Sequence, residues 1–473
     1  MAGIVLGASI LLGVVFHDLG AGWYALPLVA AGALVAVVGR PDRRSGLLAI
    51  AAAACVLLGF WRASVDRPRS VASLPTDEYR YQGIVIGMPS RTAAGSTARL
   101  ELRDPAGGSA WVLLPAVPEV RQGDVIACRG LARRDPTRKD PTTLLPSGGS
   151  GAPVIRASSC SILGSEASVL EAGRADLEGG LRTRLESNIP EPAGSLAAGV
   201  ILGDDGDMTA STGDAFRNAG LSHITAVSGW NVALVAGLLA FVTGRARARL
   251  PVALALGVVG IWGFAYLVGM GPSVIRAAVM GSLALVAGWR GRPADSLTSL
   301  VWASAAMVLL SPSTGHDVGF QLSVAATAAI VVTAPLLAGW PRWTAMAAIP
   351  VAAELAVAPL LLHHFGAYSV VAPLANVVAA PLIPAVMFGA LVTGLASLVH
   401  PILAAAAGIG TWLPARLLVG VAEGAAGVPY LSGRTVPVSW RGVIVAYAVL
   451  AAVYGLLWYV RFGGLARRAA AGT

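Results

Sequence analysis

Residues 224–244 read ITAVSGWNVALVAGLLAFVTG and contain no charged side chain. A helix of this length rises about 30 Å, which is the thickness of the hydrocarbon core of a bilayer. Residues 251–270 and 442–460 form similar uncharged stretches. All three stretches predict helices that span a membrane rather than helices buried in a soluble core.

The composition of the whole chain also favours a membrane protein. Of its 473 residues, 56% are hydrophobic and 12% are charged, whereas soluble domains are about 25% charged. The first apolar run, residues 3–16, has no basic segment before it and no small-residue cleavage site after it. It therefore predicts a first span rather than a signal peptide.

The apolar stretches predict about twelve spans. They are residues 3–18, 21–38, 46–62, 224–243, 251–269, 272–288, 295–311, 318–339, 343–362, 374–398, 402–421 and 442–460. Arginines follow every second span, at Arg40, Arg43, Arg44, Arg245, Arg247, Arg249, Arg290, Arg292, Arg342, Arg461, Arg467 and Arg468, although Arg434 and Arg441 precede the last span. Because cytoplasmic loops collect arginine, both termini are predicted to be cytoplasmic and the polar stretch 69–222 extracytoplasmic.

The predicted fold class is an all-α polytopic membrane bundle with a small extracytoplasmic β-barrel inserted in it. The predicted domains are a three-span segment (1–65), an OB-like barrel (76–165), an amphipathic helix with a connecting segment (166–222), a transmembrane core (223–462) and a short cytoplasmic tail (463–473). The amphipathic helix is predicted from Leu170, Leu177, Leu181 and Leu185, which recur at helical spacing among charged residues. Such a helix lies on the membrane surface or on the bundle.

The barrel is predicted from short β-rich runs between Gly, Pro and Asp clusters, at residues 79–86, 97–102, 110–114, 124–131 and 154–162. Barrels of the OB type often bind single-stranded nucleic acid by stacking bases on aromatic rings. Tyr79, Tyr81 and Trp111 are the candidate contacts. The alternative is an accessory barrel whose aromatic rings pack its own core.

Three cysteines are present, of which Cys55 falls in the third predicted span while Cys128 and Cys160 fall in predicted strands. A cysteine pair in an oxidising compartment predicts a disulfide between Cys128 and Cys160. Two unpaired buried thiols are the alternative.

Three blocks of the second half resemble the ComEC family of DNA-uptake membrane proteins. The first has Gly203-Asp204 followed by FRNAGLSHITAVSG at 216–229; the second has GMGPSVIRAAVM at 269–280 with DVGFQLS at 317–323; the third joins Pro359, Phe365, Ser369, Pro373, Asn376 and Pro381. Many members have His where this chain has Asn231, which puts a role of that His in doubt here. Many members also end in a metallo-β-lactamase-like domain, and this sequence is expected to be a form without it.

The resemblance implies translocation of single-stranded DNA through the cell membrane of a bacterium into the cytoplasm during natural transformation. It also implies an extracytoplasmic DNA receptor and a cytosolic motor ATPase as partners, beside the lipid bilayer and a possible second copy of the chain. The candidate DNA pathway residues are Arg276, Asn231, Ser228, His223, Gln321, Asn376 and Glu354. Polar and ionisable side chains at membrane depth are costly, so they usually face a cavity or one another.

Several of these residues have a plainer interpretation. Arg276 near the start of its span suits a phosphate contact, or else an arginine that reaches outward or pairs with Asp317. Glu354, in the middle of a span, suits a proton site, a buried pair or a structural hydrogen bond. Ser228, Gly229 and Asn231 in one span and three prolines in another suit a wet pathway, or else ordinary helix packing.

No enzyme chemistry is predicted, with no catalytic residue, metal or cofactor. The six histidines show no H-x-H spacing, and the one lysine, Lys139, is followed by Asp140, which excludes a P-loop. One rival function is a secondary transporter of a small anionic or lipid-linked solute with Glu354 as its coupling site. Another is a membrane enzyme that uses Asp204, Asp205, Asp207 and His223.

Overall fold

A computed structural model describes most of the chain from residue 78 onward. The described residues are 78–85, 90–92, 95–104, 109–114, 120–133, 154–203, 208–225, 229–245, 249–290, 296–311, 314–315, 317–428, 432–434 and 438–471. The three predicted spans before residue 65 lie outside this part. The chain divides into two compact units, and each is described over the residues given above. The first unit is Met1–Gly180 with Ser228–Phe320, and the second is Leu181–Val227 with Gln321–Thr473.

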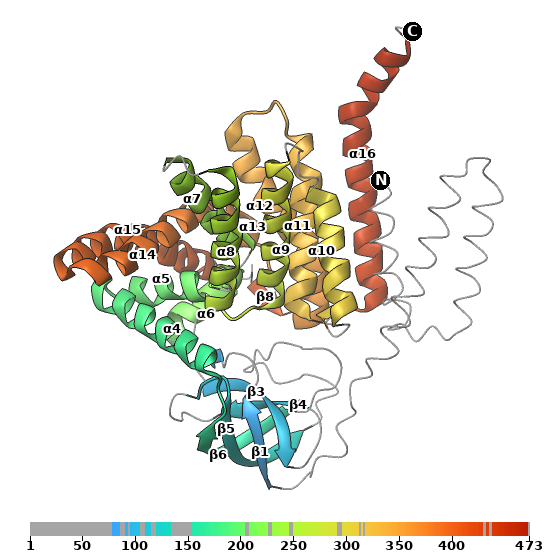
Figure 1. Cartoon of the computed structure of the whole chain (residues 1–473). Coiled ribbons are helices and arrows are strands. Elements are labelled where there is room, and N and C mark those ends of the chain that lie inside the picture. The colour runs from blue at the N-terminus through green and yellow to red at the C-terminus, as the bar shows by residue number, and fades with distance from the viewer. Residues whose placement is uncertain are drawn as a thin grey trace. The chain divides into compact units, whose positions relative to one another are not determined.

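The first unit contains a strongly curved β-sheet (Figure 1). Its strands are β1 (Tyr79–Val85), β2 (Ser90–Thr92), β3 (Gly95–Asp104), β4 (Ser109–Leu114), β5 (Asp124–Arg133) and β6 (Val154–Ser165). The order is β1-β5-β6-β4-β3-β2, and β1 also pairs with β3. All pairs are antiparallel except β4 with β6. Each predicted strand thus corresponds to an observed one, and β2 is an addition.

The sheet encloses its own core because its strands alternate apolar and polar side chains. On β3, Ala98, Leu100 and Leu102 are buried, while Glu101 and Arg103 between and after them are exposed. Tyr81 and Ile126 join the same core. Cys128 on β5 lies directly opposite Cys160 on β6, and a disulfide joins the two.

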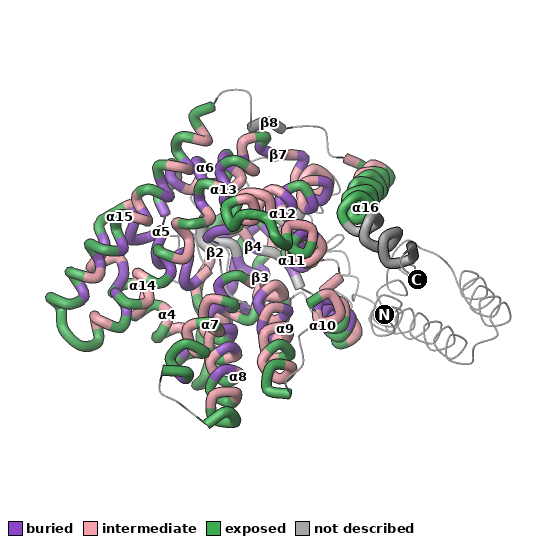
Figure 2. Tube along the Cα trace, turned by 90° about the horizontal axis from the view of Figure 1, so that it is seen from above, coloured by how far each residue is buried: buried purple, intermediate pink, exposed green. Residues whose placement is uncertain are grey.

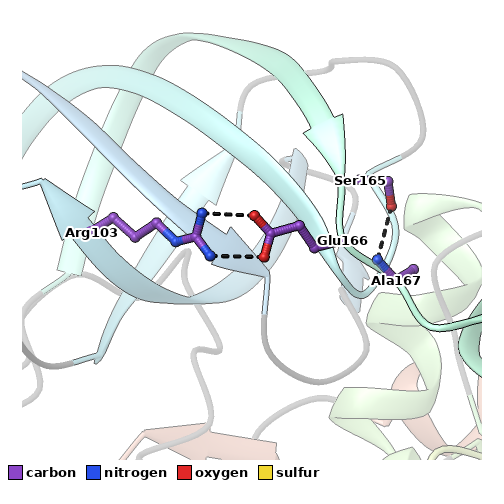
Figure 3. Close-up of polar contacts among 4 residues, drawn as sticks. All are labelled: Arg103, Ser165, Glu166 and Ala167. Atoms are coloured by element: carbon purple, nitrogen blue, oxygen red, sulfur yellow. Dashed lines mark hydrogen bonds and ion pairs between the residues drawn. The ribbon is translucent and has the colours of Figure 1, made fainter.

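The β-sheet is tied to the helix that follows it, α4 (Val169–Asn188). In Figure 3 the Nη1 and Nη2 atoms of Arg103 on β3 each donate to one carboxylate oxygen of Glu166, at 2.8 Å. This bidentate hydrogen bond lowers the pKa of the Glu166 carboxyl below its usual value. Gln122 before β5 donates to Glu171 and accepts from Arg174 in α4. The first half of α4 is therefore held against the sheet.

Ser168 and Glu171 form a capping box at the start of α4. The Glu171 carboxylate accepts from the Ser168 backbone N–H at 2.8 Å, and the Ser168 hydroxyl accepts from the Glu171 N–H at 3.2 Å. The hydrogen bonds that the Glu171 carboxylate accepts from the Ser168 N–H and hydroxyl lower the pKa of this carboxyl. Of the leucines that predicted an amphipathic helix, Leu170 and Leu177 are exposed, whereas Leu185 is buried.

The other helices of the first unit are α7 (Gly229–Arg245), α8 (Leu250–Leu267), α9 (Pro272–Trp289) and α10 (Ser296–Leu310). Helix α7 packs on α8 and α9, α8 packs on α9, and α9 packs on α10. Gly257 and Gly260 on α8 allow this close approach, because a Cβ at either position would meet a leucine side chain of α9 or α7 at under 3 Å.

The second unit is helical apart from one short pair of strands. It contains α5 (Ala193–Leu202), α6 (Ala210–Asn218), the 3-10 turn η1 (Ser222–Ile224), α12 (Arg342–Phe365), β7 (Ala367–Ser369), α13 (Ala372–Ala379), α14 (Leu382–Val399), α15 (Pro401–Ala426), β8 (Ser432–Arg434) and α16 (Trp440–Ala471), with most of α11 (Val318–Leu336). Strands β7 and β8 pair antiparallel. Helix α5 is buried along its whole length and packs on α14 and α15.

Eight helices in the described residues are long and apolar enough to cross a membrane. They correspond to predicted spans that begin at residues 224, 251, 272, 318, 343, 374, 402 and 442. Two predictions need correction. The predicted span 295–311 is α10, which has 15 residues and is shorter than a full crossing. The predicted span 374–398 is divided into α13 and α14, because Pro381 precedes α14 and has no N–H to continue the ladder of α13.

The exposed faces of these helices are apolar, as contact with lipid requires. On α16 the window that could span the membrane is 6% buried, and Figure 2 shows most of the part of this helix that is coloured by burial as exposed. Leu456, Tyr459 and Val460 are among its exposed side chains. The protein is therefore a multi-pass membrane protein.

Candidate functional site

Arg276 is a buried cation in the transmembrane helices of the first unit. Helix α9 begins with Pro272, which suits a first helical position, and places Arg276 about one turn further on. Its side chain is 2% exposed. A Cβ placed on Gly229 would lie 3.7 Å from Arg276 Nη2 and 3.4 Å from the Ala277 side chain. The guanidinium therefore lies against the first turn of α7.

Of the two predicted pathway residues that flank Gly229 in the sequence, one belongs to α7. Asn231, two residues after Gly229, is 2% exposed. Ser228 lies outside the described residues. The structure thus brings Gly229 of one sequence block beside Arg276 of the next block.

Glu354 is the buried carboxylate of the second unit. It lies near the middle of α12 and is 7% exposed. Asn376 Nδ2 on α13 donates to Glu354 Oε2 at 3.1 Å, and Asn376 is also 7% exposed. The Asn376 side chain also lies close enough to His223 of η1 to interact with it. Three predicted pathway residues, distant in sequence, therefore form one connected group.

Gln321 joins a second polar group of the same unit. His364 Nε2 and Gln321 Oε1 are 2.8 Å apart. His363 Nδ1 lies 2.6 Å from the carbonyl oxygen of Val438, and both histidine rings lie against Trp440 at the start of α16. This group connects α11, the end of α12 and the start of α16.

Sequence reasoning missed two tyrosines that fix α16. The Tyr447 hydroxyl donates to the carbonyl of Ala356 on α12 at 2.8 Å. The Tyr454 and Thr333 hydroxyls, from α16 and α11, are 2.8 Å apart. Hydroxyl-bearing side chains inside an apolar span were the available signal, since buried polar groups are normally hydrogen-bonded.

The aromatic contacts predicted for the β-sheet are only partly compatible with its structure. Tyr81 is 0% exposed and packs in the core of the sheet, so its predicted role in base stacking is wrong. Tyr79 is half-buried, stacks edge-on against Tyr81 and donates its hydroxyl to Asp104. Trp111 lies on β4, and its side chain is outside the described part.

The described residues contain no group of three or more His, Cys, Asp or Glu side chains placed to hold an ion. Asp204, Asp205 and Asp207, which the rival enzyme hypothesis requires, lie outside the described residues.

Comparison with known proteins identifies the relatives of this chain. It is 24% identical over 220 residues to "ComE operon protein 3" of Bacillus subtilis (strain 168), a match that covers 45% of this chain and 28% of that protein. It is 30% identical over 217 residues to "Competence protein ComA" of Neisseria gonorrhoeae, covering 44% of this chain and 30% of that protein. The chain thus spans less than a third of each of these curated relatives. No solved structure matches.

The match to the competence protein family extends over residues 200–461, which is more than half of the chain. It includes every helix from α6 to most of α16, together with Arg276, Asn231, Glu354 and Asn376. The chain is therefore a member of the competence protein family.

Proposed function

We propose that this protein is an inner-membrane channel that passes single-stranded DNA into the cytoplasm during natural transformation. Membership of the competence protein family supports a role in DNA uptake. The observation that best supports a channel is the burial of polar side chains in helices whose exposed faces are apolar. Arg276 and Asn231 in the first unit and Glu354 and Asn376 in the second are all buried.

The surroundings of Arg276 suit a phosphate. The guanidinium lies beside the first turn of α7, and helix N-termini carry a partial positive charge with unsatisfied N–H groups. Two positive features at one point favour an anion. A nucleic-acid strand presents a phosphate at every nucleotide, and arginine binds phosphate oxygens bidentately.

The β-sheet is proposed to be an OB-like barrel that receives the strand. Pairing of β1 with both β5 and β3, together with the parallel pair β4–β6, supports the barrel. Arg80 on β1 lies directly opposite Arg129 on β5, and both are exposed. Like charges placed opposite each other destabilise a sheet, and a bound phosphate chain relieves this repulsion. These arginines replace Tyr81 as the proposed contact.

No covalent chemistry is proposed, and we propose that both termini lie in the cytoplasm. An extracytoplasmic receptor would deliver the DNA, and a cytosolic motor ATPase would pull the strand. Association of two or more copies is proposed because α16 exposes an apolar face that suits lipid or a second chain equally.

The test is uptake of labelled DNA into a nuclease-protected cytosolic pool. Cells that lack the protein are compared with cells restored by wild type, Arg276→Ala, Arg276→Lys or Arg290→Ala. Arg290 caps the other end of α9 and is exposed, so it serves as the matched control. We expect uptake to vanish on deletion, to return with wild type and Arg290→Ala, and to fall at least tenfold with Arg276→Ala, equivalent to about 1.4 kcal/mol.

Arg276→Lys keeps the charge but loses the bidentate geometry, so partial uptake is expected. If deletion leaves uptake intact in a transformable host, DNA is the wrong cargo. The alternative function is then a secondary transporter of a small anionic or lipid-linked solute, which the buried Glu354 carboxylate favours.

A further inference from the structure

Glu354 lies deep in an apolar helix. It is the thirteenth residue of α12, about 18 Å from the start of the helix at 1.5 Å per residue. Helix α12 is long and apolar enough to cross a membrane. The Glu354 side chain is nevertheless buried inside the second unit rather than exposed on the lipid face.

The polar neighbours of Glu354 are one amide, two tyrosines and one histidine. Asn376 donates an amide hydrogen to the carboxylate, and α13, which carries it, has no ionisable residue. Tyr368 on β7 lies close enough to interact with the Glu354 charge. Tyr447 on α16 uses its hydroxyl on the backbone of α12. His223 of η1 interacts with Asn376, which in turn hydrogen-bonds Glu354.

No arginine or lysine forms an ion pair with Glu354 in the described part of the chain. Burying an ionised carboxylate without a cation is costly, and such a group neutralises instead. A single neutral donor such as Asn376 offsets a small part of that cost. The geometry therefore suits a carboxyl that takes up and releases a proton within the membrane core.

We propose that Glu354, oriented by Asn376 and His223, is a proton-binding site whose occupancy couples proton movement to transport. The proton-binding site stands whether or not DNA is the cargo; its coupling to DNA movement rests on the proposed function. Asn376 connects α13 to α12 and η1. Loss of the proton would strengthen its hydrogen bond to the carboxylate and shift these three elements toward one another.

The test uses the full chain in membranes without any DNA. Dicyclohexylcarbodiimide reacts with buried protonated carboxyls, adding across its C=N bond and rearranging to a stable N-acylurea without a leaving group. Labelled Glu354 is identified by mass spectrometry from pH 5 to 9. We expect labelling at low pH that falls about tenfold per pH unit once the carboxyl ionises. Glu354→Gln abolishes it, and Glu423→Gln, at an exposed carboxylate paired with Arg416, leaves it unchanged.

Asn376→Ala provides the test of the positioning role. Removal of the amide donor destabilises the ionised form, so the fall in labelling moves to higher pH. A merely structural Asn376 would leave the pH profile in place.

Two outcomes would overturn the proposal. If sodium ions at fixed pH protect Glu354 from the carbodiimide, the site binds sodium instead. If Glu354 is unlabelled at pH 5 and the infrared carbonyl band of a protonated carboxyl is the same in wild type and Glu354→Gln, the carboxylate stays ionised. Because neither measurement includes DNA, failure here is distinguishable from failure of the uptake experiment.

Discussion

Buried polar side chains distinguish this membrane core from a purely structural helix bundle. Arg276, Asn231, Glu354 and Asn376 are all among the least exposed side chains of helices that otherwise expose leucine, valine and tryptophan. A polar group in hydrocarbon is retained when its partners or its function offset the cost. For Glu354 the partner is a neutral amide, which offsets little of the cost of a charge and leaves function as the stronger explanation.

The ion pair of Arg103 with Glu166 gives a pH-dependent prediction at the residue scale. The lowered pKa of Glu166 means that the pair stabilises the link to α4 above the unfolded pKa, about 4.3, and that this stabilisation is lost as the pH falls through the folded value. We expect Arg103→Ala to speed hydrogen–deuterium exchange of residues 163–168 at pH 7.

The difference between Arg103→Ala and wild type should shrink as the pH falls below about 4, because protonated Glu166 no longer attracts Arg103. The effect is small because both side chains are about half exposed. Arg80→Ala, at another exposed arginine of the same sheet, is the control. A difference that persists undiminished at low pH would show that Arg103 acts through packing instead.

At the scale of elements, close helix contacts in the second unit depend on small residues. Gly408 on α15 faces the end of α4, where a Cβ would lie 2.1 Å from the backbone oxygen of Asn188. Gly410, on the same helix, has open space around it. Backbone cannot move aside as a flexible side chain can, so the two glycines differ sharply in what they tolerate.

We therefore expect Gly408→Ala to destabilise the protein by about 1–3 kcal/mol, the usual cost of overpacking. Gly410→Ala should be neutral or slightly stabilising, since alanine favours helix over glycine. Thermal unfolding of the two variants in detergent, followed by size-exclusion chromatography, measures the difference. Equal melting temperatures would mean that α15 does not approach α4 as closely as the structure shows.

At the scale of the whole molecule, the arginine distribution predicts which side of the membrane each loop faces. It predicts that the C-terminal end of α7 lies in the cytoplasm and the first half of α4 outside it. We expect a membrane-impermeant maleimide to label Gly173→Cys in intact spheroplasts and to label Arg245→Cys only after permeabilisation. Gly173 has open space around it, so a cysteine there is tolerated.

Both substitutions are made in a background with Cys55 replaced by serine, and Cys128 and Cys160 stay protected as a disulfide. The reverse labelling pattern would invert the topology and place the β-sheet in the cytoplasm. Labelling of both positions in intact spheroplasts would mean that the loop after α7 is not cytoplasmic.

Local patterns predicted much of the fold. Uncharged apolar runs located the long helices, because span length is set by bilayer thickness and not by neighbours. Alternation of apolar and polar side chains in residues 79–162 located five strands, because the two-residue period of a strand is also a local property. Local patterns did not predict elements whose stability depends on neighbouring helices. Helix α5 is apolar, short and fully buried, and it is stable as a helix because α14 and α15 cover it.

Hydropathy and short motifs are local properties, so the amino-acid sequence was enough to predict a multi-pass membrane protein of the competence family. It also indicated Glu354, Asn376, Gln321 and Cys128 as candidate residues. Which of these residues contact each other became known from the folded structure: Glu354 with Asn376, Gln321 with His364, and Cys128 with Cys160. It likewise turned Tyr81 inward, since strand register and helix packing, not residue type, determine which side chains become neighbours.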